Sequence, residues 1–150
     1  DKDAGVRAVS AETLGQFGDS AAADVLIELI RGDGSERVRM AALRGLVKCD
    51  DPRSVVVLLE TAEEDKSVSI KRQAMKCMLW KFDGNVRRTR DPRDERMWRD
   101  LIQRWKWDGR VRAAYAAAGV PLIHRPQDVV GRDWHPERRG LASGPEDDKD

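Results

Sequence analysis

The chain has 150 residues, of which 40% are hydrophobic and 37% are charged, and its net charge is +1. This length is sufficient for one domain with a sizeable core, and this composition is typical of helix-rich soluble proteins with much exposed charge. No stretch of the sequence approaches the ~20 apolar residues that a membrane-spanning helix requires, so a transmembrane protein is not predicted for this segment.

The first 83 residues contain a repeat with a period of 32 residues. An aspartate opens each unit, a branched aliphatic residue follows five positions later, and a cation comes directly after it. These positions are Asp1, Asp33 and Asp65, then Val6, Val38 and Ile70, then Arg7, Arg39 and Lys71. A period of 20 to 50 residues is typical of a solenoid, because one small unit cannot bury its apolar face without a neighbour.

Each unit is predicted to form a helical hairpin. Apolar or small residues at helical spacing indicate a first helix, as in Val6, Ser10, Ala11 and Leu14, and the aspartate before it suits a helix N-terminus. Turn-forming pairs follow at Asp19-Ser20, Asp51-Pro52 and Asp83-Gly84. Second helices with Val25 to Ile30 and Val55 to Ala62 come next. The small residues Ala11, Ala42 and Ala74 predict a close approach of successive first helices.

The recurring cation admits two interpretations. Arg7, Arg39 and Lys71 lie near a helix start, where the helix dipole disfavours positive charge. We therefore expect an aspartate of the same or the adjacent unit to pair with each cation and form a structural ladder. The alternative is a row of cations that faces a partner.

The pattern changes after residue 83. The arginine-rich residues 85–92 predict an insertion in a third unit that spans 65–107, and a helix is expected from about residue 91 to residue 107. Its apolar side contains Met97, Trp98, Leu101, Ile102 and Trp105, and Arg93, Arg96, Arg99 and Arg104 lie largely on the other side. Residues 110–119 predict a degenerate further helix. We thus expect a repeat domain over 1–119, with units 1–32 and 33–64 complete, and a partly disordered extension over 120–150.

Two segments carry a family resemblance. VRAVSAETLGQFGDSAAADVLIELIRGD and VRMAALRGLVKCDDPRSVVVLLETAEED, which begin at Val6 and Val38, resemble HEAT repeats, in particular the short HEAT-like type of the phycobilisome lyases. The resemblance implies an all-α protein, an α-solenoid whose stacked hairpins form a right-handed superhelix that is usually used to bind proteins. Because the sequence opens within the repeat register, we also expect further units before residue 1, so that the chain is the C-terminal part of a longer array.

The functional prediction is a non-catalytic scaffold or adaptor that binds a protein partner. In the family the second helices line the concave side, where this chain has the acidic residues Asp24, Glu28, Glu60, Glu63 and Glu64. A basic peptide or protein surface would complement them, although they are also consistent with ordinary solvated carboxylates. Trp80 occupies the position of Gln16 and Lys48, which is predicted to point outward, and an exposed tryptophan can anchor an interface.

Two other functions stay open. Nucleic-acid binding through residues 87–112 would use Arg88, Arg96 and Arg99, although the nearby acidic residues also fit a solvated ion-pair surface. An enzyme or lyase on the same scaffold would need a pocket with convergent polar groups. We expect no cofactor and no metal, since His124 and His135 make no recognised ligand spacing, neither cysteine lies near them in sequence, and no nucleotide-binding or nucleophile motif is present. Cys49 and Cys77 are predicted to be buried thiols.

Overall fold

The computed structural model describes residues 3–83 and 95–123. Every regular element within these two ranges is an α-helix, which confirms the predicted all-α class. The chain divides into two compact units, residues 1–91 and residues 92–150, and each is described here by itself. None of the helices in the described ranges is both long enough and apolar enough to span a membrane.

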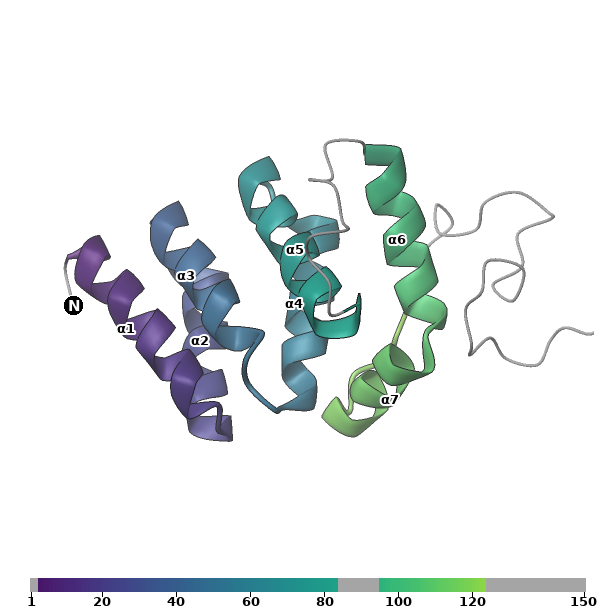
Figure 1. The fold of residues 1–150 in the computed structure, drawn as a ribbon, viewed down its shortest axis with the longest axis horizontal. Helices are drawn as coiled ribbons and strands as arrows, with labels where there is room; N and C mark the ends of the chain where they lie inside the picture. The colour runs from purple at the N-terminus through teal and green to yellow at the C-terminus, as the bar shows by residue number, and fades with distance from the viewer. Residues whose placement is uncertain (1–2, 84–94, 124–150) are drawn as a thin grey trace, which may run out of the picture. The chain divides into compact units, whose positions relative to one another are not determined.

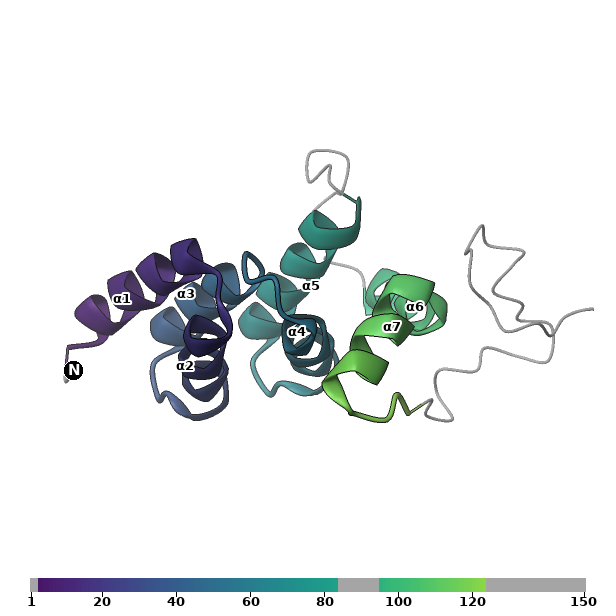
Figure 2. The ribbon, with the colours of Figure 1, turned by 90° about the horizontal axis from the view of Figure 1, so that it is seen from below.

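The first unit is a short α-solenoid with two helical hairpins and the first helix of a third. Helices α1, α3 and α5 lie side by side in one layer, and α2 and α4 form a second layer behind them (Figures 1 and 2). The helices span Ala4–Phe17 for α1, Ser20–Gly32 for α2, Glu36–Leu46 for α3, Pro52–Glu64 for α4 and Val68–Asp83 for α5. The hairpins predicted from the 32-residue period are therefore confirmed.

Polar side chains fix where the helices begin. The carboxylates of Asp19 and Asp51 accept hydrogen bonds from the first-turn amides of α2 and α4 and satisfy donors that would otherwise have no partner. At the start of α3 this role belongs to Ser35, whose hydroxyl accepts a bond from the Val38 amide. Asp33, the aspartate predicted to suit the start of α3, lies two residues before Ser35 as the C-cap of α2, and its carboxylate accepts a hydrogen bond from the Ser35 amide.

The closest packing in this unit is between α1 and α3, at two glycines. A Cβ atom built on Gly15 would lie 2.4 Å from the Cα of Gly45, and one built on Gly45 would lie 2.7 Å from the carbonyl oxygen of Ala11. Ala11, Ala42 and Ala74 are fully buried, in agreement with the predicted role of small residues. The sequence analysis did not identify the glycines that set the distance between α1 and α3.

The recurring aliphatic position of the repeat is buried in two of three units. Val38 and Ile70 have no exposed surface, because α3 packs against α1 and α2, and α5 packs against α3 and α4. Val6 differs, since its side chain is exposed, and Ser10 on the same predicted stripe is exposed as well. The predicted apolar stripe of α1 is therefore divided, since Val6 and Ser10 are exposed whereas Ala11 is buried against α3.

The second unit contains α6 (Glu95–Trp107) and α7 (Gly109–Ala118), and these two helices pack on each other. Asp108 caps α7, and Gly119 ends it in the left-handed conformation, with φ of 72°. Trp98, Ile102 and Trp105 are buried as the amphipathic pattern predicted, whereas Met97 is partly exposed. Helix α7 corresponds to the helix expected over 110–119. The insertion predicted over 85–92 and all but the first residues of the predicted tail lie outside the described ranges.

Candidate protein-binding surface

Two ion pairs of the same kind connect successive units of the repeat. The Nε atom of Arg7 donates to Asp33 Oδ2 at 2.8 Å, and its Nη2 atom donates to Oδ1 at 3.1 Å. Arg39 forms the corresponding pair with Asp65, also 26 residues later, and its Nε atom donates to the Ile30 carbonyl at 3.0 Å. The structural ladder predicted for these two arginines is therefore confirmed.

The two aspartates of the ladder also organise the turns between units. Oδ1 of Asp33 accepts a bond from the Ser35 amide at 2.9 Å, and Oδ1 of Asp65 accepts one from the Ser67 amide at 2.9 Å. The hydrogen bonds from Arg7 lower the pKa of Asp33 below its ordinary value, and the same contact raises the pKa of Arg7. Arg7 and Arg39 thus stabilise the scaffold, because each bonds to the aspartate that follows a second helix.

A second polar link joins the N-terminal ends of α2 and α4. Arg53 donates to both carboxylate oxygens of Asp51, at 3.1 Å and 2.9 Å, and it also forms an ion pair with Asp24 on α2. The Ser20 hydroxyl donates to Asp51 at 3.3 Å. The bond from Arg53 lowers the pKa of Asp51, and the bonds to Asp51 and Asp24 raise the pKa of Arg53. Asp24, one of the predicted partner-binding residues, is therefore already paired within the protein.

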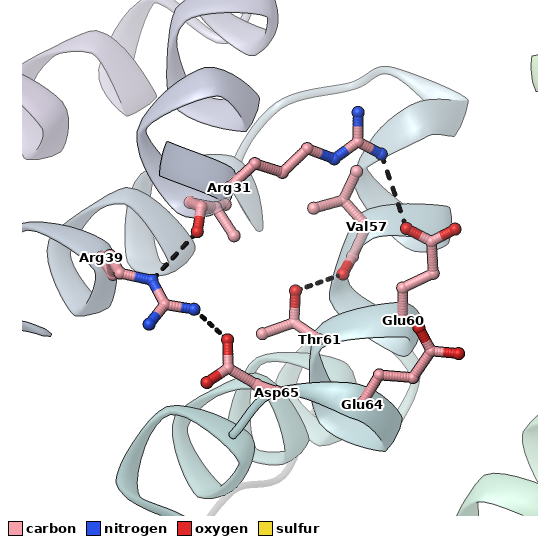
Figure 3. A pocket seen from close by; sticks show the side chains of 8 residues that line it. Arg31, Arg39, Val57, Glu60, Thr61, Glu64 and Asp65 are labelled. Atoms are coloured by element: carbon pink, nitrogen blue, oxygen red, sulfur yellow. Dashed lines mark hydrogen bonds and ion pairs between the residues drawn. The ribbon is translucent and has the colours of Figure 1, made fainter. Parts of the chain in front are cut away.

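An open hollow of about 210 Å³ lies between α2 and α4 and extends to the turn after α4 (Figure 3). Its floor contains the apolar side chains of Ile30 and Val57 and the buried Thr61, whose hydroxyl donates to the Val57 carbonyl at 2.7 Å. Its rim is charged. The rim residues are Arg31, Arg39, Glu60, Glu64 and Asp65.

The rim of this hollow carries charges of both signs. Arg31 forms an ion pair with Glu60 at 3.5 Å, and Arg39 pairs with Asp65. Figure 3 shows Glu60 and Glu64 one helical turn apart on α4, with the Glu60 carboxylate turned toward Arg31. Three carboxylates and two guanidinium groups thus lie around apolar residues of α2 and α4.

The predicted acidic row is only partly brought together. Glu60 and Glu64 line the hollow, Glu28 is exposed on α2, and Glu63 is half-buried on α4. The sequence analysis did not identify Arg31 and Arg39 as parts of the same surface. Arg31 follows the apolar stripe of α2, and Arg39 belongs to the ladder, so neither stood out from its neighbours.

Trp80 lies on α5 with 49% of its surface exposed. Gln16 on α1 and Lys48 after α3 occupy the corresponding repeat positions, and both are exposed too. The outward orientation predicted for this position is therefore confirmed. Its role as an anchor for a partner stays a prediction.

The arginine-rich segment is described only in part. Arg96 and Arg99 are exposed on α6, whereas Arg88 lies outside the described residues. Arg110 pairs with Asp108 at 2.8 Å, and the Arg112 guanidinium lies 5.9 Å from the centroid of the Trp107 ring. Burial raises the pKa of the Asp108 carboxyl, but the hydrogen bonds from Arg110 and the backbone outweigh it, so this pKa is lowered.

The two cysteines are buried and free, as the sequence predicted. Burial raises the pKa of both thiols, that of Cys77 to about 11. The Sγ atom of Cys77 lies 3.6 Å from the Leu43 carbonyl oxygen, and that of Cys49 lies 3.7 Å from the Gly45 carbonyl oxygen. Because the thiolate is the nucleophile, neither cysteine is suited to nucleophilic chemistry near neutral pH.

Residues 3–83 and 95–123 contain no group of three or more His, Cys, Asp or Glu side chains placed to hold a metal ion. His124 and His135 lie outside these ranges.

These observations define a class of protein, an α-solenoid built from stacked helical hairpins that are tied together by arginine–aspartate pairs. The family model described as HEAT repeats matches residues 1–78, about half of the chain, and the chain belongs to this family. HEAT repeats commonly mediate protein–protein interactions and are generally not enzymes. No curated protein and no solved structure matches the chain significantly.

Proposed function

We propose that this chain is a non-catalytic scaffold that binds a protein partner at the hollow between α2 and α4, and that the partner inserts a basic side chain there. The single observation that carries the proposal is the hollow itself, in which the carboxylates of Glu60, Glu64 and Asp65 lie around the apolar residues Ile30 and Val57. A lysine or arginine side chain suits such a site, because its aliphatic stem can cover apolar surface while its charged end meets the carboxylates.

The hydrogen bonds of Arg39 support binding at this place. Arg39 donates to both Asp65 and the Ile30 carbonyl and is therefore positioned before a partner binds. Ordering a long side chain on association costs ~0.5–1.5 kcal/mol, so charges that are already positioned lose less on binding than mobile ones. Arg31 pairs with Glu60, Arg39 pairs with Asp65, and the Thr61 hydroxyl donates to the Val57 carbonyl. None of these contacts places a nucleophile beside a base, which favours binding over catalysis.

The test removes the two carboxylates at the mouth of the hollow. Proteins captured by the wild-type chain from its native source are purified individually and titrated against a Glu60→Gln/Glu64→Gln variant. We expect the affinity of a true partner to fall about tenfold or more, as for charged contacts at the centre of an interface. A Glu12→Gln/Glu36→Gln variant is the matched control, because it removes the same charge from exposed positions on α1 and α3.

The proposal fails if every partner binds both double variants as tightly as it binds the wild type. It also fails if the control variant weakens binding by the same factor, since overall charge would then explain the effect. Circular dichroism of each variant establishes that the helices are intact.

A second candidate function is nucleic-acid binding by the second unit, and it is favoured by the exposed Arg96 and Arg99 on α6. The affinity for a defined oligonucleotide should then fall steeply with salt, with a logarithmic slope of about −0.9 for each phosphate contact on a duplex. An Arg96→Ala/Arg99→Ala variant should reduce both affinity and slope. Binding that is independent of salt and of these two residues would exclude this function for α6.

A further inference from the structure

Trp80 lies in a basic region of the first-helix layer. Helices α3 and α5 are neighbours in this layer (Figure 1), and the Lys81 ammonium donates to the Val47 carbonyl at 3.4 Å, so the last turn of α5 lies beside the end of α3. The residue after Val47 is Lys48, and it is exposed. The residue before Lys81 is Trp80, and 49% of its surface is exposed. The two exposed side chains therefore belong to one surface that α3 and α5 form together.

Two more cations extend this surface by one helical turn. Arg44 precedes Lys48 by four residues, the spacing that brings two side chains to one side of a helix. Lys76 precedes Trp80 by the same spacing on α5. Arg44 is exposed, and Lys76 is half-buried. We call the resulting surface the tryptophan face, and it consists of Arg44, Lys48, Lys76, Trp80 and Lys81.

Carboxylates are scarce on the two helices that form this face. Helix α3 contains one acidic residue, Glu36 in its first turn, and α5 contains one, Asp83 at its end. Glu12 on α1 pairs with Arg44 at 2.8 Å. Asp50 is exposed, but its amide donates to the carbonyl of the residue that ends α1, which places Asp50 beside the C-terminal end of α1. Cations therefore predominate on α3 and α5.

We propose that the tryptophan face binds an acidic segment of a protein partner, in which one apolar side chain packs on Trp80 and flanking carboxylates meet the lysines. An exposed tryptophan offers a large apolar area and a hydrogen-bond donor, and tryptophan is enriched among the residues that dominate binding at protein interfaces. The surrounding cations favour a partner with carboxylates and raise its association rate. None of the five residues lines the hollow between α2 and α4, so this surface is separate from the one proposed above for a basic side chain.

The number of charges favours an acidic protein segment over a nucleic acid. A protein whose binding is dominated by the nucleic-acid backbone makes about 6–10 phosphate contacts. On the tryptophan face Arg44 is already paired with Glu12, and the Glu12 carboxylate would repel a phosphate at this edge. The cations that remain are the lysines Lys48, Lys76 and Lys81. A few charge contacts around one apolar anchor suit a short acidic segment of a protein.

The test selects short random peptides displayed on phage against the full chain and measures the affinity of each selected peptide. A Lys48→Glu/Trp80→Ala variant removes the apolar anchor and reverses the exposed charge beside it. A Lys66→Glu/Val68→Ala variant is the matched control, because it makes the same charge change and truncates an exposed apolar side chain at the opposite end of α5. Circular dichroism establishes that the helices are intact, and Lys48→Glu alone replaces the double variant if that variant loses helicity.

We expect a group of selected peptides with aspartate and glutamate around an aromatic or aliphatic residue. Their affinity should fall at least about tenfold for the Lys48→Glu/Trp80→Ala variant and stay unchanged for the control. It should also fall as the salt concentration rises, since salt screens exposed charges. The proposal is overturned if no selected peptide distinguishes the two variants, or if the peptides that do so are not acidic.

Three further measurements separate this proposal from its alternatives. A single-stranded oligonucleotide that binds more tightly than every acidic peptide and loses its binding in the Lys48→Glu/Trp80→Ala variant would identify a nucleic acid as the occupant and overturn the proposal. A dimer in sedimentation that the same variant dissociates would identify a second copy of this chain and overturn it too. The Glu60→Gln/Glu64→Gln variant should bind the acidic peptides as tightly as the wild type does, so a failure of the hollow as a binding site leaves this result unchanged.

Discussion

The contact between α1 and α3 makes a prediction that can be worked out from distances. Replacing Gly15 with Ala places a methyl carbon 2.4 Å from the Gly45 Cα, 2.8 Å from its carbonyl oxygen and 3.0 Å from its carbonyl carbon. Ordinary carbon–carbon contact is at about 3.5–4.0 Å, so the new methyl group is ~1.1–1.6 Å too close to the Gly45 Cα. The obstructing atoms belong to the backbone and cannot rotate away, so α1 and α3 must separate.

Two opposing terms set the size of the effect. Alanine in place of glycine in a helix interior stabilises the helix by ~1 kcal/mol. Inserting a methyl group into a filled interface typically costs ~1–3 kcal/mol, and the upper end applies here because the backbone itself must move. The expected net loss in the free energy of unfolding is therefore about 2 kcal/mol.

Gly32 provides the matched control. It is the last residue of α2, and a Cβ atom at this position would meet nothing within 4 Å. Gly32→Ala should leave the free energy of unfolding unchanged or raise it by up to about 1 kcal/mol, whereas Gly15→Ala should lower it. Labelling of the buried thiols as a function of urea concentration follows the first unit, because Cys49 and Cys77 both belong to it. A Gly15→Ala variant as stable as the wild type would refute the close packing of α1 on α3.

The other predictions concern the ladder pair of Asp33, the loss of stability at low pH and the reactivity of the two buried thiols. Asp33→Asn removes a hydrogen-bonded pair that is largely shielded from solvent, so it should lower the urea midpoint by more than Glu12→Gln, which removes an exposed pair. Since the pKa values of Asp33 and Asp51 are lowered below the ordinary 3.8, the stability that they contribute is fully present above that pH. It is lost as the pH falls through their folded-state values, and the wild type should therefore lose more stability on acidification than the Asp51→Asn variant does. Near neutral pH Cys49 and Cys77 should resist thiol reagents in the native protein and react once urea unfolds the first unit; rapid native labelling would contradict their burial.

The sequence predicted the hairpins because two independent periodicities agree. Helical spacing within a unit and the 32-residue spacing between units both place Val38 and Ile70 in the core, and both are buried. The pairing of Arg7 and Arg39 with aspartates could also be predicted, since a cation near a helix N-terminus needs a compensating charge. These features follow from local chemistry repeated along the chain.

Other features depend on how the helices are oriented, which the repeat pattern does not contain. Gly15 and Gly45 are 30 residues apart, so they occupy different positions in a 32-residue register and cannot be recognised as a pair. Their contact arises from the crossing of α1 and α3. For the same reason the sequence did not predict that Arg53 would pair with Asp24 while Glu60 remains at the mouth of the hollow.

The same orientation distinguishes the two interfaces between first helices. Between α1 and α3 a glycine on each side allows backbone contact, whereas between α3 and α5 the side chain of Cys77 takes the place that Gly45 has in the first interface. The second-helix layer must follow these unequal spacings, because α2 packs against α3 and α4 packs against α5. If the hollow between α2 and α4 binds a partner as proposed, the spacing of the opposite layer should influence its opening. Gly15→Ala, which touches no part of the hollow, is therefore expected to change the affinity for that partner as well as the stability.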